Sequence, residues 1–277
     1  MYKPLLCGKY KLSFDKTIIM GILNVTPDSF SDGGLFYNTD KAVEHAEQMV
    51  KDGAQIIDVG GESTRPGSAP ISLKEELKRV KPVIKRLLRE ADVPVSIDTY
   101  KPEIAGECLK LGVHMVNDIT GLTNENMLRI VKKYRVPVIL MHMKGKPKTM
   151  QKNPHYKDVV DDIKQFLKNR IAKAGKAGIK DVIIDPGIGF GKTTEHNLQI
   201  LKRLSEFKEL KCPILVGPSR KSFIGNIIGM PPNERLEGTL AAVAIAIMNG
   251  ANIVRVHDVK ECKRAVQIAD AIRCVDG

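Results

Sequence analysis

A short apolar run that ends in a polar residue recurs eight times along the 277-residue chain, and this repeat limits the possible folds more than any other feature. Each run is rich in Val and Ile and nearly continuous in apolarity, which is typical of strands buried on both faces of a parallel sheet. Segments with helical periodicity lie between the runs. The runs are TIIMGILN, AQIIDVGG, VPVSIDT, HMVNDIT, VPVILMH, DVIIDPG, CPILVGPS and NIVRVHD.

The spacing of the runs matches a repeated strand–helix unit. The polar ends of the first and last runs, Asn24 and Arg255, are 231 residues apart, which makes seven steps of 33. A strand, a helix and two loops fill about that length. The repeat therefore predicts an α/β fold, a single (β/α)8 TIM barrel over residues 1–277. The alternative, an open doubly wound sheet, would concentrate its chemistry at one switch point instead of at every strand end.

Local signals add detail to this barrel. Before the first strand, the segment LLCGKYKLSF has the pattern of a hairpin around Gly8, and we expect it to plug the barrel floor. Ser72 with Glu75, and Asp258 with Glu261, have the spacing of a capping box at a helix start. Two long loops rich in Gly, Ser and Pro should act as lids over the strand ends. They are TPDSFSDGGLFYN after the first strand and GGESTRPGSAPIS after the second.

In a barrel, the polar residues at the ends of all eight strands converge on one face. Some of them are cations or donors and could hold a phosphate or diphosphate: Arg255, His257, Lys221 and Arg65, with Asn24 and Thr64. Others would form a deeper, acceptor-rich floor: Asp98, Asn117 and Asp185. A carboxylate accepts two N–H bonds side by side, so this floor suits a planar, amino-substituted heterocycle. The two sets predict a ligand with a nitrogenous ring and an anionic tail.

The composition excludes several classes of protein. No apolar run reaches the roughly 18 residues that a membrane span needs, so we expect no membrane partner. Five scattered cysteines without C-x-x-C spacing argue against a disulfide framework and a Cys-based zinc site, and they predict a cytoplasmic location. The formal net charge of +12 permits attraction of anionic partners. Much of this charge lies on one predicted helix, SLKEELKRVKPVIKRLLREA, whose mixed charges are typical of a solvated face.

Eight segments between residues 20 and 259 make the sequence similar to the dihydropteroate synthase family. They are MGILNVTPDSFSDGG, IDVGGESTRPG, SIDT, VNDITG, LMHMKG, IIDPGIGFGKT, GPSRKSFIG and VRVHDV. The first loop, the STRPG loop and the SRKSFIG segment separate this family from other pterin-binding barrels. The family joins 4-aminobenzoate to (7,8-dihydropterin-6-yl)methyl diphosphate, which gives 7,8-dihydropteroate and diphosphate in folate biosynthesis. The resemblance implies the same transferase activity for this chain.

The resemblance also implies roles for single residues. The pterin would be held by Asp98, Asn117 and Asp185, with Lys221 on its carbonyl side. The diphosphate would be bound by Thr64, Arg65, Arg255 and His257, and Asn24 would meet a Mg²⁺ ion on that diphosphate. The 4-aminobenzoate pocket would be lined by Phe30, Pro66, Phe190 and Ser222, and Asp32 would help to order the closed loops. Of these residues, the expected catalytic ones are Asp98, Lys221, Arg255 and Asp32.

These residues support a dissociative substitution. The diphosphate leaves first, aided by Mg²⁺ and the cationic side chains, which neutralise its growing charge. The neutral aromatic amine then attacks the pterin methylene cation, so the reaction needs positioning and no strong base. The family is usually a homodimer, and we expect the apolar stretch TLAAVAIAIM to contribute to the dimer interface.

Two alternatives stay open at this point. A corrinoid-linked methyltetrahydrofolate methyltransferase shares the pterin-binding barrel, but it has no use for the STRPG loop or for Arg255 and His257 around a diphosphate. A basic nucleic-acid-binding module would explain the charge of +12 and should bind polynucleotide with a steep salt dependence. The sequence lacks the interleaved basic and aromatic residues of such a module, so we expect no nucleic-acid partner.

Overall fold

The strands of the barrel lie side by side in one parallel sheet. The computed structural model describes residues 2–26, 35–64 and 67–275. The sheet has the strand order β8-β7-β6-β5-β4-β3-β10-β9, and a backbone bridge from Ile184 to Ile214 joins its two outer strands, so the sheet closes. The strands are β3 (Ile18–Asn24), β4 (Ile56–Gly60), β5 (Val95–Asp98), β6 (Met115–Asp118), β7 (Val138–Met141), β8 (Val182–Asp185), β9 (Leu215–Val216) and β10 (Ile253–Val256). All eight predicted strands are confirmed.

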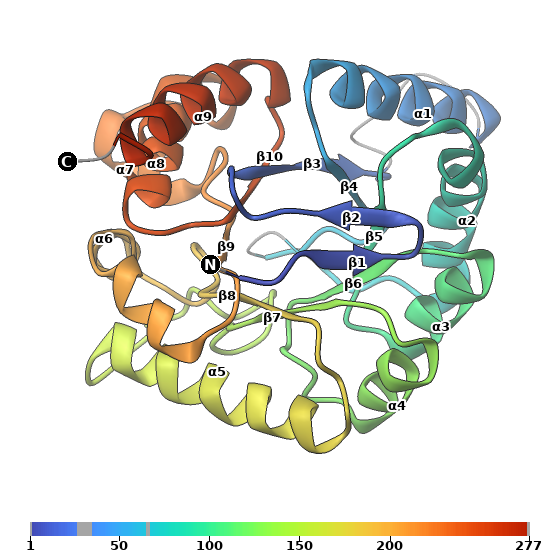
Figure 1. Ribbon diagram of the computed structural model, residues 1–277, viewed down its shortest axis with the longest axis horizontal. Helices are drawn as coiled ribbons and strands as arrows, with labels where there is room; N and C mark the ends of the chain where they lie inside the picture. The colour runs from blue at the N-terminus through green and yellow to red at the C-terminus, as the bar shows by residue number, and fades with distance from the viewer. Residues whose placement is uncertain (1, 27–34, 65–66, 276–277) are drawn as a thin grey trace.

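Helices surround the strands on the outside of the barrel (Figure 1). The helices of the described residues are α1 (Leu35–Asp52), α2 (Leu73–Glu90), α3 (Pro102–Leu111), α4 (Glu125–Tyr134), α5 (Val159–Lys176), α6 (Thr194–Lys202), α7 (Ser222–Ile228), α8 (Leu236–Met248) and α9 (Val259–Arg273). Two short 3-10 helices, η2 (Leu204–Leu210) and η3 (Pro232–Glu234), extend the connections around β9. The prediction of a TIM barrel is confirmed. None of these helices is long and apolar enough to cross a membrane.

Alternate residues of each strand pack into two separate cores. On β3, Ile19 and Leu23 belong to the large core between the sheet and the helices. Ile18 and Met20 belong to a smaller cluster inside the barrel, together with inward residues of six other strands. This alternation follows from strand geometry, in which successive side chains point to opposite faces. The strands are therefore buried on both faces, as their continuous apolarity predicts.

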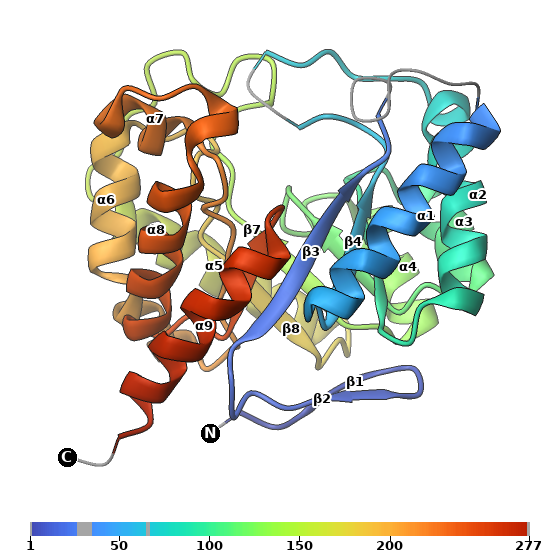
Figure 2. The same ribbon diagram turned by 90° about the horizontal axis from the view of Figure 1, so that it is seen from above.

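The N-terminal hairpin completes the inner core. Strand β1 (Leu5–Cys7) pairs antiparallel with β2 (Tyr10–Leu12), and the turn passes through Gly8 at φ +61°. The buried side chains of this segment, Leu5, Cys7, Leu12 and Phe14, join the cluster inside the barrel. Figure 2 shows the hairpin beneath the end at which β3 begins. The prediction that it plugs the barrel floor is confirmed.

One of the two predicted helix caps forms and the other does not. The Ser72 hydroxyl accepts a hydrogen bond from the Glu75 backbone N–H at 3.2 Å at the start of α2. Asp258 stands at the N-cap of α9, so the predicted helix start is confirmed, but its side chain caps no backbone N–H and the predicted capping box is wrong. The physical reason is competition, because both carboxylate oxygens of Asp258 pair with the guanidinium of Arg220.

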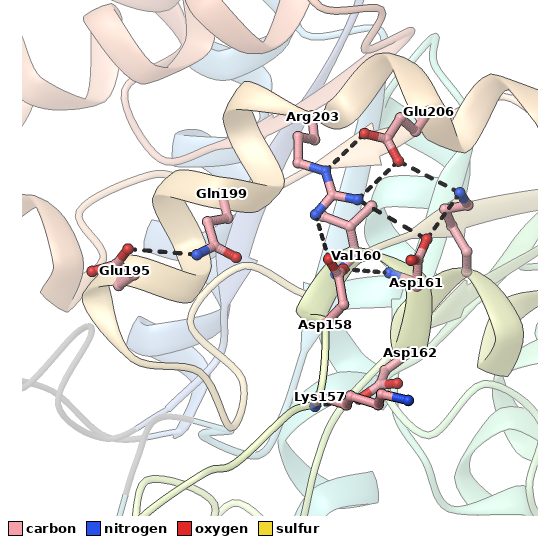
Figure 3. A network of polar contacts seen from close by, with 10 residues as sticks. Lys157, Asp158, Val160, Asp161, Asp162, Glu195, Gln199, Arg203 and Glu206 are labelled. Atoms are coloured by element: carbon pink, nitrogen blue, oxygen red, sulfur yellow. Dashed lines mark hydrogen bonds and ion pairs between the residues drawn. The ribbon is translucent and has the colours of Figure 1, made fainter.

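The segment from residue 151 to residue 180, which carries no family signature, has a structural role. Asp158 caps α5 by accepting hydrogen bonds from the N–H groups of Val160 and Asp161. Its other oxygen accepts from Arg203 at 2.8 Å, and Arg203 also pairs with Glu206 (Figure 3). This network ties the start of α5 to the end of α6 and to η2.

Two neighbouring leucines of the hairpin allow a matched test of whether the hairpin closes the bottom of the barrel. Leu5 is 4% exposed and Leu6, its neighbour, is 61% exposed. We expect Leu5→Ala to lower the free energy of unfolding by about 2–5 kcal/mol, because it leaves a cavity in the inner core. Leu6→Ala should change it by no more than about 0.5 kcal/mol. Urea denaturation of both variants checks this, and equal losses would mean that the hairpin does not plug the barrel.

Candidate active site

The inward face of the barrel changes from apolar to polar along each strand. Two residues beyond the inner-core residue of β4, Ile56, stands Asp58. The same step leads from Met115 to Asn117 on β6 and from Ile253 to Arg255 on β10. Since residues two apart on a strand share a face, a polar layer lies directly above the apolar floor. Its members are Asp58, Asp98, Asn117, Asp185 and Arg255.

Arg255 holds the polar layer together. Its Nε donates to Asp58 Oδ2 at 2.6 Å, and its Nη2 donates to Asp98 Oδ2 at 2.6 Å. Asp58 is fully buried, and its Oδ2 also accepts from Asn117 Nδ2 at 2.9 Å. This contact fixes the Asn117 amide with its nitrogen toward Asp58, which leaves its oxygen for another partner.

Several buried oxygens of this layer have no partner. Within the described part of the chain, the unpaired buried side-chain atoms are Asp58 Oδ1, Ser96 Oγ, Asp98 Oδ1 and Asn117 Oδ1. Buried polar atoms are normally hydrogen-bonded, because an unpaired one costs roughly 1–3 kcal/mol. Asn117 Oδ1 can only accept, and so can a carboxylate oxygen when its group is ionised, so the layer suits N–H or O–H donors from a ligand or from water.

Burial also shifts the pKa values of the ionisable groups. It raises the pKa of Asp98 to about 7, although the neighbouring Arg255 acts in the opposite direction. Burial raises the pKa of Asp185 as well, against a hydrogen bond of 2.7 Å from the Gly187 N–H to its Oδ1. It lowers the pKa of Lys221 to about 8, with Asp185 opposing this shift. Such shifts in a group of convergent polar residues are typical of functional sites.

Lys221 faces the segment that follows β8. Its Nζ donates to the Ile188 carbonyl and lies 4.2 Å from the centroid of the Phe190 ring. This contact requires a glycine at position 189. A Cβ there would lie only 2.7 Å from the Lys221 Cδ, and the backbone φ of +80° also favours glycine. The Lys221 ammonium and the Phe190 ring therefore stand side by side at the mouth.

A second buried lysine holds the same segment from behind. Lys192 Nζ contacts the ring Nδ1 of His142 at 3.1 Å and donates to the Phe190 carbonyl at 3.0 Å. Burial lowers the pKa of His142 to about 2 and also lowers the pKa of Lys192. This pair fixes the backbone at Phe190.

Three of the residues predicted to bind the diphosphate or its Mg²⁺ ion lie near neighbouring strand ends. Asn24 ends β3 and is half-buried, and Thr64 is half-buried in the loop after β4. The His257 ring lies 3.0 Å from the Ser219 hydroxyl, measured from Nδ1 to Oγ. These residues come from three neighbouring strand ends, β3, β4 and β10.

The remaining predictions divide into two groups. Ser222 is exposed at the start of α7, where it lines a pocket of about 250 Å³ with Lys192 and Asn226. Figure 2 shows α7 at the end of the barrel to which β3 points. Four predicted residues lie outside the described residues: Phe30, Asp32, Arg65 and Pro66.

Two residues of this site, Asp58 and Lys192, have no role predicted from the sequence. Asp58 carried a visible signal, since it ends its strand run just as Asp98 and Asn117 end theirs. Its contact with Arg255, 197 residues away, is apparent only in the fold. Lys192 carried no signal beyond its place in the GIGFGKT segment.

The metal-binding capacity of the site is limited. No group of three or more His, Cys, Asp or Glu side chains able to hold a metal occurs in the residues that the structure describes. The Asn24 amide oxygen has space beside it, because a Cβ on Gly60 would stand 3.6 Å from it. An ion at Asn24 would therefore depend on oxygen atoms from a ligand.

Comparisons with known proteins agree with this architecture. Residues 20–257 match the family model of the pterin binding enzymes. Dihydropteroate synthase of Escherichia coli (strain K12) is 49% identical over 255 residues, which are 91% of this chain and 90% of that protein. Xanthomonas albilineans dihydropteroate synthase with 4-aminobenzoic acid has a TM-score of 0.94 and 43% identity, with 100% of both chains covered. Its complex with 7,8-dihydropteroate has a TM-score of 0.90 and 41% identity, and covers 99% of this chain and 100% of that one.

The pKa of Asp98 predicts a pH effect on stability. Its folded-state value of about 7 exceeds the ordinary 3.8, so the folded chain keeps a proton that the unfolded chain releases. The stabilisation that this proton gives to the folded chain is complete below the ordinary pKa of 3.8, and it is lost as the pH rises through the folded-state pKa of about 7. Asp98→Asn should remove that decline from urea denaturation curves measured across this range, while Asp92→Asn, at a fully exposed carboxylate, should keep it. An Asp98 carboxyl NMR signal that titrates near 3.8 would contradict the prediction.

Proposed function

The chain belongs to the family of pterin-binding enzymes, and dihydropteroate synthases are its relatives over nearly its whole length. We propose that the polar layer is the active site of a dihydropteroate synthase, together with the loops that follow the strands. This transferase joins 4-aminobenzoate to (7,8-dihydropterin-6-yl)methyl diphosphate and releases diphosphate. The product, 7,8-dihydropteroate, belongs to folate biosynthesis. The corrinoid-linked methyltransferase and the nucleic-acid-binding module are set aside, because the relatives reported above are dihydropteroate synthases.

The unpaired acceptors of the polar layer carry this proposal. A dihydropterin presents its amino group and ring N–H groups along one edge, and Asp98 Oδ1 and Asn117 Oδ1 are buried acceptors without a partner. Asp185 supplies a further carboxylate on β8. Lys221 is the donor of this set and would bond the pterin carbonyl. Pterin binding would thus pair buried oxygens that are costly to leave without a partner.

The leaving diphosphate would meet cations on the β10 side of the mouth. The hydrogen bonds of Arg255 use Nε and Nη2, which leaves Nη1 for an anionic ligand. We assign the diphosphate to Arg255, His257, Thr64 and Arg65. The guanidinium is held by two carboxylates before the reaction, so it needs no reorganisation as the negative charge of the leaving group grows.

Magnesium fits this site as an ion carried with the substrate. Asn24 offers one hard oxygen ligand, and no cage of acidic side chains surrounds it in the described residues. Mg²⁺ commonly takes few protein ligands and completes its shell with substrate phosphates and water. When bound, the ion would neutralise charge on the diphosphate as the carbon–oxygen bond breaks.

The second substrate would bind beside Lys221. We assign the 4-aminobenzoate ring to the Phe190 side of the mouth and its carboxylate to the Ser222 end, with Phe30 and Pro66 completing the pocket and Asp32 helping to order the loops. Lys192 holds the backbone of Phe190 through a hydrogen bond to its carbonyl, and the Lys221 ammonium lies against the Phe190 ring. The neutral amine can then attack the pterin methylene cation without a strong base, and the proton that its nitrogen loses passes to water. The carboxylates of Asp98 and Asp185 would stabilise the cation before this attack.

We also propose that the enzyme is a homodimer. Helices α8 and α9 expose a continuous apolar surface whose residues include Ile245, Met248, Ile268 and Ile272, at 46–65% exposure. A groove of about 520 Å³ runs between them. Apolar surface of this kind marks interaction sites, and a second copy of the same surface would cover it. A cytoplasmic location agrees with the five free cysteines of the structure.

The activity itself is tested by product formation. The enzyme should release one diphosphate for each 7,8-dihydropteroate formed from the pterin diphosphate and 4-aminobenzoate. Chelation of Mg²⁺ should suppress product formation, and excess Mg²⁺ should restore it. A folded enzyme that forms no dihydropteroate under these conditions would contradict the proposed function.

Asp185→Asn tests the pterin assignment. The amide keeps the shape and can still accept from the Gly187 N–H, but it replaces one acceptor oxygen with a donor. Pterin binding measured by calorimetry should weaken by about 1–3 kcal/mol, the cost of an unpaired buried polar group. The matched control is Asp181→Asn, an exposed carboxylate at the other end of the same strand, which should bind pterin as the parent does. Unchanged affinity in Asp185→Asn would remove Asp185 from the site.

Ile268→Arg tests the dimer. An arginine in the centre of the α8–α9 surface should convert the dimer to a monomer, because a buried unpaired charge at an interface costs several kcal/mol. Light scattering after size-exclusion chromatography measures the mass. Leu198→Arg, at an exposed apolar residue of α6, is the control and should remain dimeric. A monomeric parent would overturn the proposal.

A further inference from the structure

A buried ammonium group joins the loop after β4 to the end of β5. Lys101, three residues beyond Asp98, donates from Nζ to Glu62 Oε2 and Glu76 Oε2, each at 2.6 Å. It also donates to the Ile71 carbonyl at 2.8 Å. The side chains of Glu62, Glu76 and Lys101 are 7%, 1% and 12% exposed. This ion cluster is therefore far less hydrated than an ordinary surface pair, whose contribution is small.

The same cluster holds both ends of the segment from residue 62 to residue 71. Glu62 accepts from the Ile71 N–H at 2.8 Å and from the Tyr100 hydroxyl at 2.7 Å. Burial alone would raise the pKa of Glu62, but the hydrogen bonds from Lys101, Ile71 and Tyr100 keep that pKa below its ordinary value. The carboxylate therefore stays charged, and the two ends of the segment stay together.

Two further contacts extend the cluster. Arg79 of α2 donates to the Gly61 carbonyl at 3.1 Å, which fixes the residue before Glu62. On the β5 side, the Thr99 hydroxyl donates to Glu76 at 2.9 Å, and the Thr99 N–H donates to the Asn117 carbonyl at 3.1 Å. The chain that leaves Asp98 is thus bonded to the same helix as the loop that carries Thr64.

We propose that Lys101 is a positioning residue for the reaction. It holds Glu62 and Ile71 beside the end of β5 and so keeps Thr64 at a fixed distance from Asp98. Lys101 touches no substrate in this assignment. It connects the loop assigned to the diphosphate with the strand assigned to the pterin. The residues that bind the two ends of one substrate therefore keep a constant distance from each other. The inference rests on the proposed function for the identity of the two ligand groups, but the bonds of Lys101 do not depend on it.

Lys101→Met tests this role. We expect kcat/KM to fall by about tenfold to a hundredfold, the effect of displacing a binding group by about 1 Å. Affinity for a pterin without diphosphate should stay at the parent value, because the polar layer is unchanged. Hydrogen exchange in residues 62–71 should become faster. Lys101→Arg should recover part of the exchange protection, since a guanidinium can donate to both carboxylates.

Lys110→Met is the matched control, because Lys110 lies on α3, the helix that follows Lys101, and its ion pair with Glu107 is far more exposed. It should change neither kcat/KM nor exchange. A folded Lys101→Met with parent kinetics and parent exchange would overturn the proposal, and so would an equal loss of affinity for the diphosphate-free pterin.

If Lys101→Met does not fold, Tyr100→Phe decides. That variant removes one hydrogen bond from Glu62 and should show faster exchange in residues 62–71 with a lower kcat/KM. No change in either quantity would overturn the proposal. Failure of the proposed function is distinguishable, because a parent without dihydropteroate synthesis would contradict that function while exchange still reports whether Lys101 holds the segment.

Discussion

The site depends on a guanidinium that neutralises two carboxylates inside the barrel. Arg255 comes from the last strand, whereas Asp58 and Asp98 come from the second and third strands of the barrel, so the bridge crosses the interior. Loss of Arg255 would leave two buried charges uncompensated, a loss that is strongly destabilising. The same bridge orients Asn117 through Asp58. The positions of the unpaired acceptor oxygens are therefore set by an ion cluster within the protein.

The apolar floor explains why the polar layer faces only one way. Inner-core residues such as Ile56 and Ile253 stand two residues before Asp58 and Arg255, and the hairpin closes the barrel beneath them. The polar layer is thus sealed from the side of the hairpin, and a ligand can reach it only from the mouth. Burial also raises the pKa of Asp98 and lowers the pKa of Lys221. Stability and reactivity share this cause, since the shifts that mark the site arise from the packing that holds the barrel.

The repeat in the sequence predicted the eight strands and most of the floor, because the period of a strand determines which residues share a face. Pairings between distant residues could not be predicted in this way. Asp258 has the local pattern of a cap, yet Arg220, 38 residues earlier, takes its carboxylate. Nothing in the sequence distinguishes Lys101 and Lys192 from surface lysines. Their burial and their hydrogen-bond partners become apparent only in the fold. The assignments of residues in the two loops remain predictions that rest on the family resemblance.

The arrangement of charges also decides how substitution can proceed. As the diphosphate leaves in the proposed mechanism, negative charge grows toward Arg255 and positive charge grows on the pterin methylene. Arg255 cannot move toward the leaving group without breaking its bonds to Asp58 and Asp98, so it must act from a fixed position, as a preorganised dipole does. In its ionised form, Asp98 is bonded to the cation that stabilises the diphosphate charge, and it can itself stabilise the charge on the methylene. Such a fixed pair favours departure of the leaving group before attack by the amine, because it avoids the reorganisation that water would undergo around each charge.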